Sequence, residues 1–182
     1  MSALDPVITT PRLRLELIEP DEAAGMLAGR RKPAWHPDYP RRDDLDAVSM
    51  IASPSAAGVI GDDVGWTPRH VVRAFDGLVV GSIGFFGPPT PAADGVPETE
   101  IGYGLIEDAR GRGVVTEAVS ALLAHTDRIG VRVRASVEPD NTASVRVLAK
   151  CGFTELRGSD EDGNLVMARP VSRRATTPDH DR

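Results

Sequence analysis

Short stretches of the chain are rich in apolar residues, and two of them alternate apolar with polar positions as a half-buried β-strand does. The alternation is clean at 13–17 and 131–137. The stretches 71–75 and 78–86 flank Asp76-Gly77, a favoured two-residue hairpin turn. We therefore expect strands over these four ranges. Two further strands are expected at 99–106 and 165–168.

Helical spacing is clearest after residue 114. Val115, Val119, Leu122 and Leu123 fall at i, i+4, i+7 and i+8, which is one apolar stripe and predicts a helix over 115–128. Three further helices are predicted: one that starts at Pro20-Asp21-Glu22, one over 43–51, and one capped by Asn141 that ends at Gly152-Phe153.

Strands with interleaved helices predict an α/β fold, with helices packed around a mixed central sheet. A length of 182 residues suits one domain with a sizeable core. We expect a single domain over residues 1–171. The polar segment 172–182 is expected to be a disordered tail.

A polar loop with two glycines precedes the helix at 115–128. Gly111 and Gly113 open a turn whose backbone N–H groups lie unpaired beside the positive end of the helix dipole, and this arrangement is typical of phosphate sites. Arg110 and Arg112 add positive charge. The spacing matches neither G-x-x-x-x-G-K-[ST] nor G-x-G-x-x-G, so it excludes both nucleotide-loop types.

The segment Arg110-Gly111-Arg112-Gly113-Val114-Val115 resembles the [Q/R]-x-x-G-x-[G/A] signature of the GCN5-related N-acetyltransferases. Val115 departs from it, because Gly or Ala is usual there. Three further blocks resemble the branch that includes ribosomal-protein N-terminal acetyltransferases. In chain order they are the T-P-R-L-x-L block at 10–15, the E-I-G-Y block at 100–103 and the N-x-x-S…K-x-G-F block at 141–153.

The resemblance implies a mostly antiparallel sheet with a V-shaped split between two central strands, and acetyl-coenzyme A as co-substrate. Backbone amides of 103–105 would align the pantetheine, and the loop would hold the pyrophosphate. The cofactor-binding residues implied are Tyr103, Gly104, Leu105, Arg110, Gly111, Arg112, Gly113, Val114, Val115, Thr116 and Asn141. Asn141 is explained equally well as a helix N-cap.

Amine acetylation needs a neutral amine and a proton for the departing thiolate. Glu100, one strand before the loop, is our preferred general base, with Glu98 as the runner-up because it shares that strand face. The alternative is that Glu100 only attracts the ammonium group, or that it faces solvent. The resemblance places Ser144 near the sulfur as a possible acid. Many relatives use a later tyrosine, but no tyrosine follows Tyr103 in this chain.

The irregular segment 30–65 and the loop 87–96 are expected to select the acceptor. Trp35, Tyr39 and Glu98 are the candidate acceptor contacts. Trp35 and Tyr39 are explained equally well as residues that cover the core.

Composition narrows the possible partners. A net charge of −6 and a pI near 5.2 disfavour a nucleic-acid surface and fit a cationic amine acceptor. No run of membrane-spanning length or signal-peptide layout appears, and we expect no membrane partner. Cys151 is the only cysteine, and no Cys/His pair has zinc spacing, so we expect a cytoplasmic protein without a metal. Monomer and homodimer are both compatible with the sequence.

Three functions remain open at this stage. The first is acetylation of a small-molecule amine by an acetyl-coenzyme-A-dependent N-acetyltransferase. The second is acetylation of a protein N-terminus. The third is a non-catalytic acyl-coenzyme-A-binding module, which would be consistent with Val115 and the absent later tyrosine.

Overall fold

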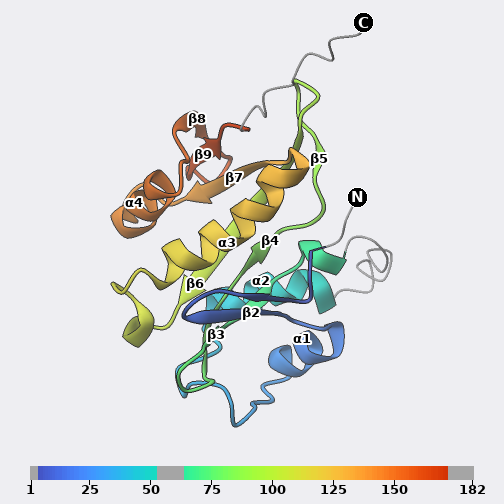
Figure 1. The fold of residues 1–182 in the computed structure, drawn as a ribbon, viewed down its shortest axis with the longest axis vertical. Coiled ribbons are helices and arrows are strands. Elements are labelled where there is room, and N and C mark those ends of the chain that lie inside the picture. Colours follow the sequence, from blue (N-terminus) through green and yellow to red (C-terminus); the bar gives the residue numbers. More distant parts are fainter. Residues whose placement is uncertain (1–3, 53–63, 172–182) are drawn as a thin grey trace, which may run out of the picture.

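The computed structural model describes residues 4–52 and 64–171. It contains a nine-stranded sheet in which eight strands follow the order β1-β2-β3-β4-β6-β7-β9-β8, and β5 pairs with β6 (Figure 1). The strands are β1 (Val7–Thr9), β2 (Leu13–Leu17), β3 (Arg69–Arg73), β4 (Val79–Phe85), β5 (Thr90–Pro91), β6 (Pro97–Leu105), β7 (Arg132–Val137), β8 (Glu155–Ser159) and β9 (Leu165–Arg169). The mixed, mostly antiparallel architecture expected from the sequence is confirmed.

Helices cover the sheet. They are α1 (Pro20–Leu27), α2 (Arg42–Ala52), α3 (Val114–Ile129) and α4 (Thr142–Lys150), with short 3-10 turns at Val64–Trp66 and Glu107–Ala109. In Figure 1, α3 crosses the front of the sheet. Its buried residues include Val119, Leu122 and Leu123, three members of the stripe predicted from the sequence. The predicted tail at 172–182, and most of the loop predicted at 53–65, lie outside the described residues.

The sheet splits between β6 and β7, its only parallel pair in the described chain. Their pairing covers Glu98–Arg132, Thr99–Val133 and Glu100–Arg134 and goes no further. Beyond Glu100, β6 continues to Leu105 paired only with β4, while β7 pairs with β9. The two central strands therefore diverge after Glu100, which is the expected V-shaped split.

The backbone of β6 presents polar groups to this split. Phe86 N donates to Glu100 O at 2.9 Å and Ile106 N donates to Val80 O at 2.9 Å, so even-numbered residues direct their peptide groups toward β4. Because an antiparallel strand alternates these directions, the amides of Tyr103 and Leu105 face the split.

Three strands were not predicted. β1 and β5 have only three and two residues, too few for a period to show. Every residue of β8 is exposed, so its sequence has no apolar face to reveal it. Each of these strands joins the sheet through backbone pairing with a neighbouring strand: β1 with β2, β5 with β6 and β8 with β9.

Candidate active site

Two cavities lie along the open part of the split. We call the first, of about 450 Å³, the loop cavity; it lies between the loop at 109–113, the start of α3 and the side of α4. The second, of about 380 Å³, is the sheet cavity; it lies between β4, β6, the end of β7 and the start of α2. Both volumes are of the size at which proteins bind small molecules.

The loop cavity has the backbone that phosphate binding needs. Gly111 and Gly113 have φ of +72° and +74°, a left-handed conformation that glycine adopts without steric cost. Gly113 is the N-cap of α3, and no side chain caps that end. The N–H groups of the first turn of α3 therefore remain available to an anion.

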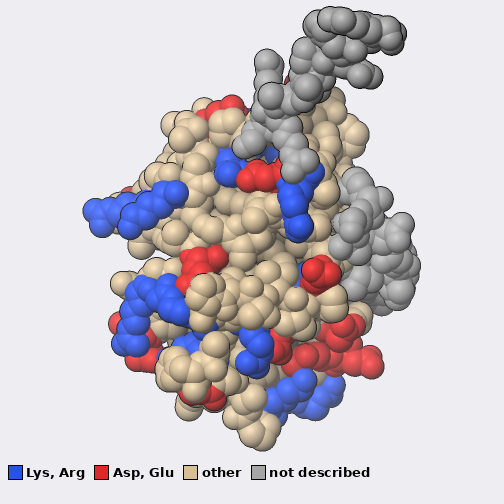
Figure 2. Space-filling view, viewed as in Figure 1, with Lys and Arg blue, Asp and Glu red and all other residues tan. Residues whose placement is uncertain are grey.

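Basic side chains line the same cavity. Arg110 lies there and also donates from Nε to Leu105 O at 3.0 Å, so it links the loop to the strand before it. Arg146 and Lys150 approach from α4. In Figure 2, Lys and Arg surfaces lie on both sides of the hollow between α4 and the loop before α3. Sequence reasoning missed Arg146 and Lys150, although both lie inside the 141–153 block.

Most residues that the resemblance implied for the cofactor line the loop cavity: Tyr103, Gly104, Leu105, Arg110, Gly111, Gly113, Val114, Val115, Thr116 and Asn141. Arg112 does not. Its side chain is 65% exposed and lines a separate groove, and its backbone carbonyl accepts a hydrogen bond from Arg12. Arg112 follows Gly111 in the tight turn, which directs its side chain away from the cavity.

Four of the expected residues lie where the two cavities meet. Tyr103, Gly104, Asn141 and Ser144 line both of them, and Arg41 and Asp43 complete the shared set. The Asn141 side chain accepts from Ser144 N at 3.0 Å, so its N-cap role is confirmed. We call this shared zone the junction.

Tyr103 reaches α4 with its side chain as well. Its hydroxyl donates to Ser144 O at 3.4 Å, and burial raises the pKa of the phenol above its ordinary value. A phenol that keeps its proton at neutral pH is able to donate it. Because side chains alternate along a strand, Tyr103 lies on the face of β6 opposite the Gly104 position that Arg41 covers.

Glu100 lies beside the junction rather than in it. Its carboxylate pairs with Arg134 at 3.0 Å and lines a third cavity of about 260 Å³, the side cavity. Phe86 lines both the side cavity and the sheet cavity, so the two adjoin at this ring. Glu100 is thus the last residue of β6 that pairs with β7 before the split opens.

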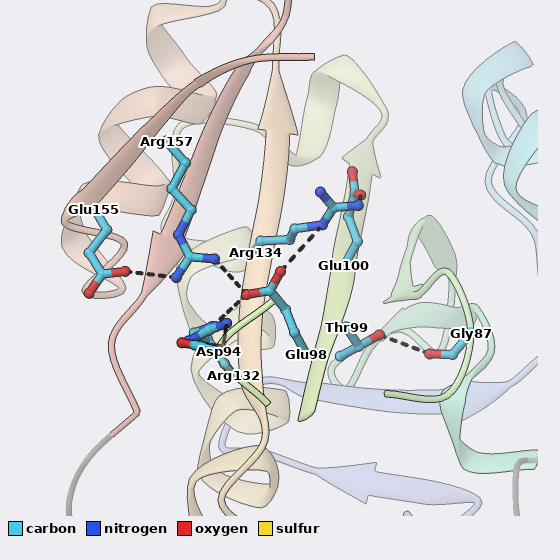
Figure 3. A network of polar contacts seen from close by, with 9 residues as sticks. All are labelled: Gly87, Asp94, Glu98, Thr99, Glu100, Arg132, Arg134, Glu155 and Arg157. Atoms are coloured by element: carbon cyan, nitrogen blue, oxygen red, sulfur yellow. Dashed lines mark hydrogen bonds and ion pairs between the residues drawn. The ribbon is translucent and has the colours of Figure 1, made fainter. Parts of the chain in front are cut away.

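Glu98 belongs to an ion-pair network at the closed end of the split (Figure 3). Its Oε2 accepts from Arg132 Nε at 2.5 Å and from Arg157 Nη1 at 2.7 Å. Arg132 also forms a two-pronged contact with Asp94, at 2.6 and 2.9 Å, and holds the pKa of that carboxyl at about 2. Glu98 therefore fastens β6, β7 and β8 together. Glu98 lines neither the loop cavity nor the sheet cavity but the side cavity, which it shares with Glu100, and its expected acceptor contact stays a prediction.

Trp35 and Tyr39 are also core residues in this structure, 6% and 0% exposed, and neither lines the two cavities. Their rings pack edge to face at 5.6 Å, and Tyr39 Oη lies 2.8 Å from His70 Nδ1. Burying two large aromatic rings stabilises the segment between α1 and α2. The residues of the irregular 30–65 segment that line both cavities are instead Asp43, an acidic residue that sequence reasoning also considered for the acceptor, and Arg41, which it did not single out.

A mixed sheet that splits beside a glycine loop, with cavities on both sides of the junction, defines an acetyltransferase fold. The model of the acetyltransferase (GNAT) domain matches residues 12–154. The chain therefore belongs to the GNAT acetyltransferase family, and it is an acetyltransferase. Among curated proteins, a sequence search found no match.

Solved structures agree on the fold. Ribosomal-protein-S5-alanine acetyltransferase from Vibrio fischeri is 15% identical with a TM-score of 0.61, covering 93% of this chain and 98% of its own. An acetyltransferase from Agrobacterium tumefaciens is 20% identical with a TM-score of 0.59, covering 93% and 97%. The microcin C7 self-immunity acetyltransferase MccE, solved with acetyl-CoA and AMP, is 16% identical with a TM-score of 0.55, covering 88% and 93%. These identities establish the fold alone.

Two further findings concern metal ions and membranes, neither of which the sequence predicted as a partner. Within residues 4–52 and 64–171, no cluster of His, Cys, Asp or Glu has the arrangement of a metal site. No helix in the same ranges has the length and apolar character needed to cross a membrane.

Proposed function

We propose that the protein is an acetyl-coenzyme-A-dependent N-acetyltransferase that acts on the primary amine of a small molecule. The observation that carries this proposal is the junction: two cavities of small-molecule size share Tyr103, Gly104, Asn141 and Ser144. A donor in one cavity and an acceptor in the other would meet there, and such positioning supplies much of the rate of a two-substrate reaction.

The loop cavity suits acetyl-coenzyme A. The left-handed glycines and uncapped start of α3 fit a pyrophosphate, and Arg146 and Lys150 add positive charge. The amides of Tyr103 and Leu105 would pair with the pantetheine, as a further strand would. Acetyl-coenzyme A would supply an acetyl group activated as a thioester.

Two proton transfers accompany the reaction. We assign the removal of a proton from the ammonium group to Glu100, directly or through water, because it lies at the closed end of the split on the same strand face as Gly102. We assign proton donation to the thiolate to the junction, with Ser144 as the first candidate and the Tyr103 hydroxyl as the second.

The sheet cavity favours a small acceptor, since about 380 Å³ is room for a small molecule. Acetylation of a protein N-terminus is the second candidate. Its support is structural similarity to proteins described as ribosomal-protein acetyltransferases. The third function that the sequence left open, a non-catalytic acyl-coenzyme-A-binding module, disagrees with the family match to an acetyltransferase domain.

One assay separates the three. The purified protein is mixed with acetyl-coenzyme A and either a panel of small primary amines or a panel of N-terminal peptides, and thiol release is followed. We expect release with small amines. Release with peptides alone would favour the second candidate. Binding of acetyl-coenzyme A without release in either panel would favour the binding module.

A further inference from the structure

Arg41 and Asp43 are the charged members of the six residues that line both cavities. Both come from the segment that begins α2, far from the glycine loop in the chain. Nothing in the motif blocks points to them. A charge at the place where two substrates meet acts on whichever atoms react there.

The guanidinium of Arg41 is held in a fixed position by a buried carboxylate. Asp44 is 0% exposed, and its Oδ2 accepts from Arg41 N at 2.8 Å and from Arg41 Nε at 3.2 Å. Its Oδ1 accepts from Ser82 Oγ at 2.5 Å. A buried charge must be paired and fully hydrogen-bonded, so Asp44 constrains the orientation of Arg41 strongly.

The other edge of the guanidinium is open to the junction. Arg41 Nη1 lies 3.5 Å from Asp43 Oδ2, beyond the distance of a strong hydrogen bond, and the Asp43 side chain is 79% exposed. Arg41 is itself only 20% exposed at its side chain. The open edge therefore retains N–H donors in a partly dry place.

Gly104 allows this guanidinium to lie against β6. A Cβ added at Gly104 would collide with Nη2 of Arg41, so a larger residue would displace it. The neighbouring amides of Tyr103 and Leu105 face the split from the same stretch of strand. Arg41 and these amides thus approach the junction from two sides.

We propose that Arg41 is a catalytic residue that hydrogen-bonds to the carbonyl oxygen of the acetyl thioester and stabilises the negative charge that develops there. The inference rests on the proposed function. In the transfer, the amine lone pair forms the new C–N bond and the C=O π pair moves to oxygen. That pair then re-forms C=O while the C–S bond breaks, with its electrons going to sulfur. The ammonium proton leaves to the base, and the thiolate takes a proton.

Three variants test this role. Arg41→Lys keeps the positive charge but replaces the planar guanidinium, with its several N–H donors, by an ammonium group. Arg41→Gln is combined with Asp44→Asn, so that no buried carboxylate is left without its partner. Gly104→Ala keeps both charges and displaces the guanidinium, at a position whose φ is not in the left-handed region. The matched control is Arg42→Gln, an exposed neighbour that lines neither cavity.

Two readouts are measured on each folded variant. The first is kcat for the best acceptor, which we expect to fall about 100-fold in the Gln/Asn double variant, as for the loss of one oxyanion donor. The second is the infrared carbonyl band of ¹³C-acetyl-coenzyme A bound without acceptor. A hydrogen bond to this oxygen weakens the C=O bond, so the band should lie lower in the wild type and Arg42→Gln than in the Arg41 and Gly104 variants.

The Kd of coenzyme A, which lacks the acetyl thioester carbonyl, should stay within about threefold in all variants. An unchanged carbonyl band in all three variants would overturn the proposal, as would a loss confined to the acceptor KM. If the wild type binds the donor but acetylates no amine, the proposed function fails while the infrared band still tests Arg41.

Discussion

Arg12 and Glu117 lie against each other although 105 residues separate them in the chain, with Arg12 Nε donating to Glu117 Oε2 at 2.6 Å. Thr10 Oγ1 and Arg12 N both donate to the other oxygen, at 2.6 and 2.9 Å. Arg12 Nη1 also donates to the carbonyl of Arg112 at 2.9 Å. The T-P-R-L block thus fastens the glycine loop and the first turn of α3 to the start of the sheet.

This contact predicts that Glu117→Gln lowers stability by about 2 kcal/mol, since it weakens hydrogen bonds to a charged group that is 16% exposed. It should also weaken coenzyme A binding, because the loop loses its support from Arg12. Chemical denaturation and calorimetric titration measure the two effects. The exposed Glu161→Gln is the control, and equal behaviour of the two variants would contradict the prediction.

The same carboxylate should give a pH dependence. Burial raises the pKa of Glu117, but the hydrogen bonds from Thr10 and Arg12 outweigh it, and the net pKa lies below its ordinary value. The stabilisation is therefore fully present above about pH 4.3, the ordinary value for a glutamate, and is lost as pH falls through the lower folded pKa. We expect the stability difference between wild type and Glu117→Gln to shrink over that range in denaturation curves.

Substitutions at the two glycines that flank α3 distinguish the cost of backbone strain from the loss of phosphate binding. Gly113 and Gly130 have φ of +74° and +70°, so Ala at either position should cost roughly 1–2 kcal/mol of stability. Only Gly113→Ala should also reduce coenzyme A affinity, because Gly113 lines the loop cavity. Denaturation and titration of both variants check this. Equal coenzyme A affinity in the two would show that the loop does not hold the phosphates.

Glu100→Gln should lower kcat by about 10²–10⁴ while leaving the Kd of acetyl-coenzyme A nearly unchanged, as for the loss of a general base. Steady-state kinetics and titration measure these values. A rise in acceptor KM at constant kcat would make Glu100 an acceptor contact instead.

Glu98→Gln provides the comparison on the same strand face. It should lower stability, because Arg132 and Arg157 both bind the Glu98 carboxylate, and the Arg132 side chain is only 8% exposed. Its kcat should stay close to that of the wild type. A large loss of kcat in Glu98→Gln with an unaffected Glu100→Gln would reverse the two roles.

The burial of His70, which is 4% exposed, predicts a second pH effect on stability. Burial lowers the pKa of His70, and the nearby Glu22 opposes this in part. The unfolded chain therefore binds a proton first, and stability falls as pH decreases below about 6.5. His70→Gln should flatten the pH dependence of the free energy of unfolding below about pH 6.5. His36→Gln, at a half-buried loop histidine, is the control. The same flattening in both variants would show that burial of His70 is not the cause.

The glycine loop, the N-cap and the helix stripes were readable in the sequence because each depends on residues close together in the chain. Gly113 needs a left-handed φ, and Asn141 reaches only to Ser144. The motif blocks also identified most of the residues that line the loop cavity. Trp35 and Tyr39 could not be placed in this way, because a large aromatic ring fits a core and a pocket equally well.

The sequence alone determined the fold class and the left-handed glycine at the start of α3. It placed a two-residue turn at Asp76-Gly77, but the hairpin closes earlier, where Arg73 N donates to Leu78 O at 2.9 Å. The tertiary structure decided which charges meet. Glu98 is tied to arginines from two other strands, Glu100 lies at the closed end of the split, and Arg41 lies over Gly104. The reason is physical: local geometry follows from neighbouring residues. The energy of a charge is set instead by partners and burial that only long-range packing supplies.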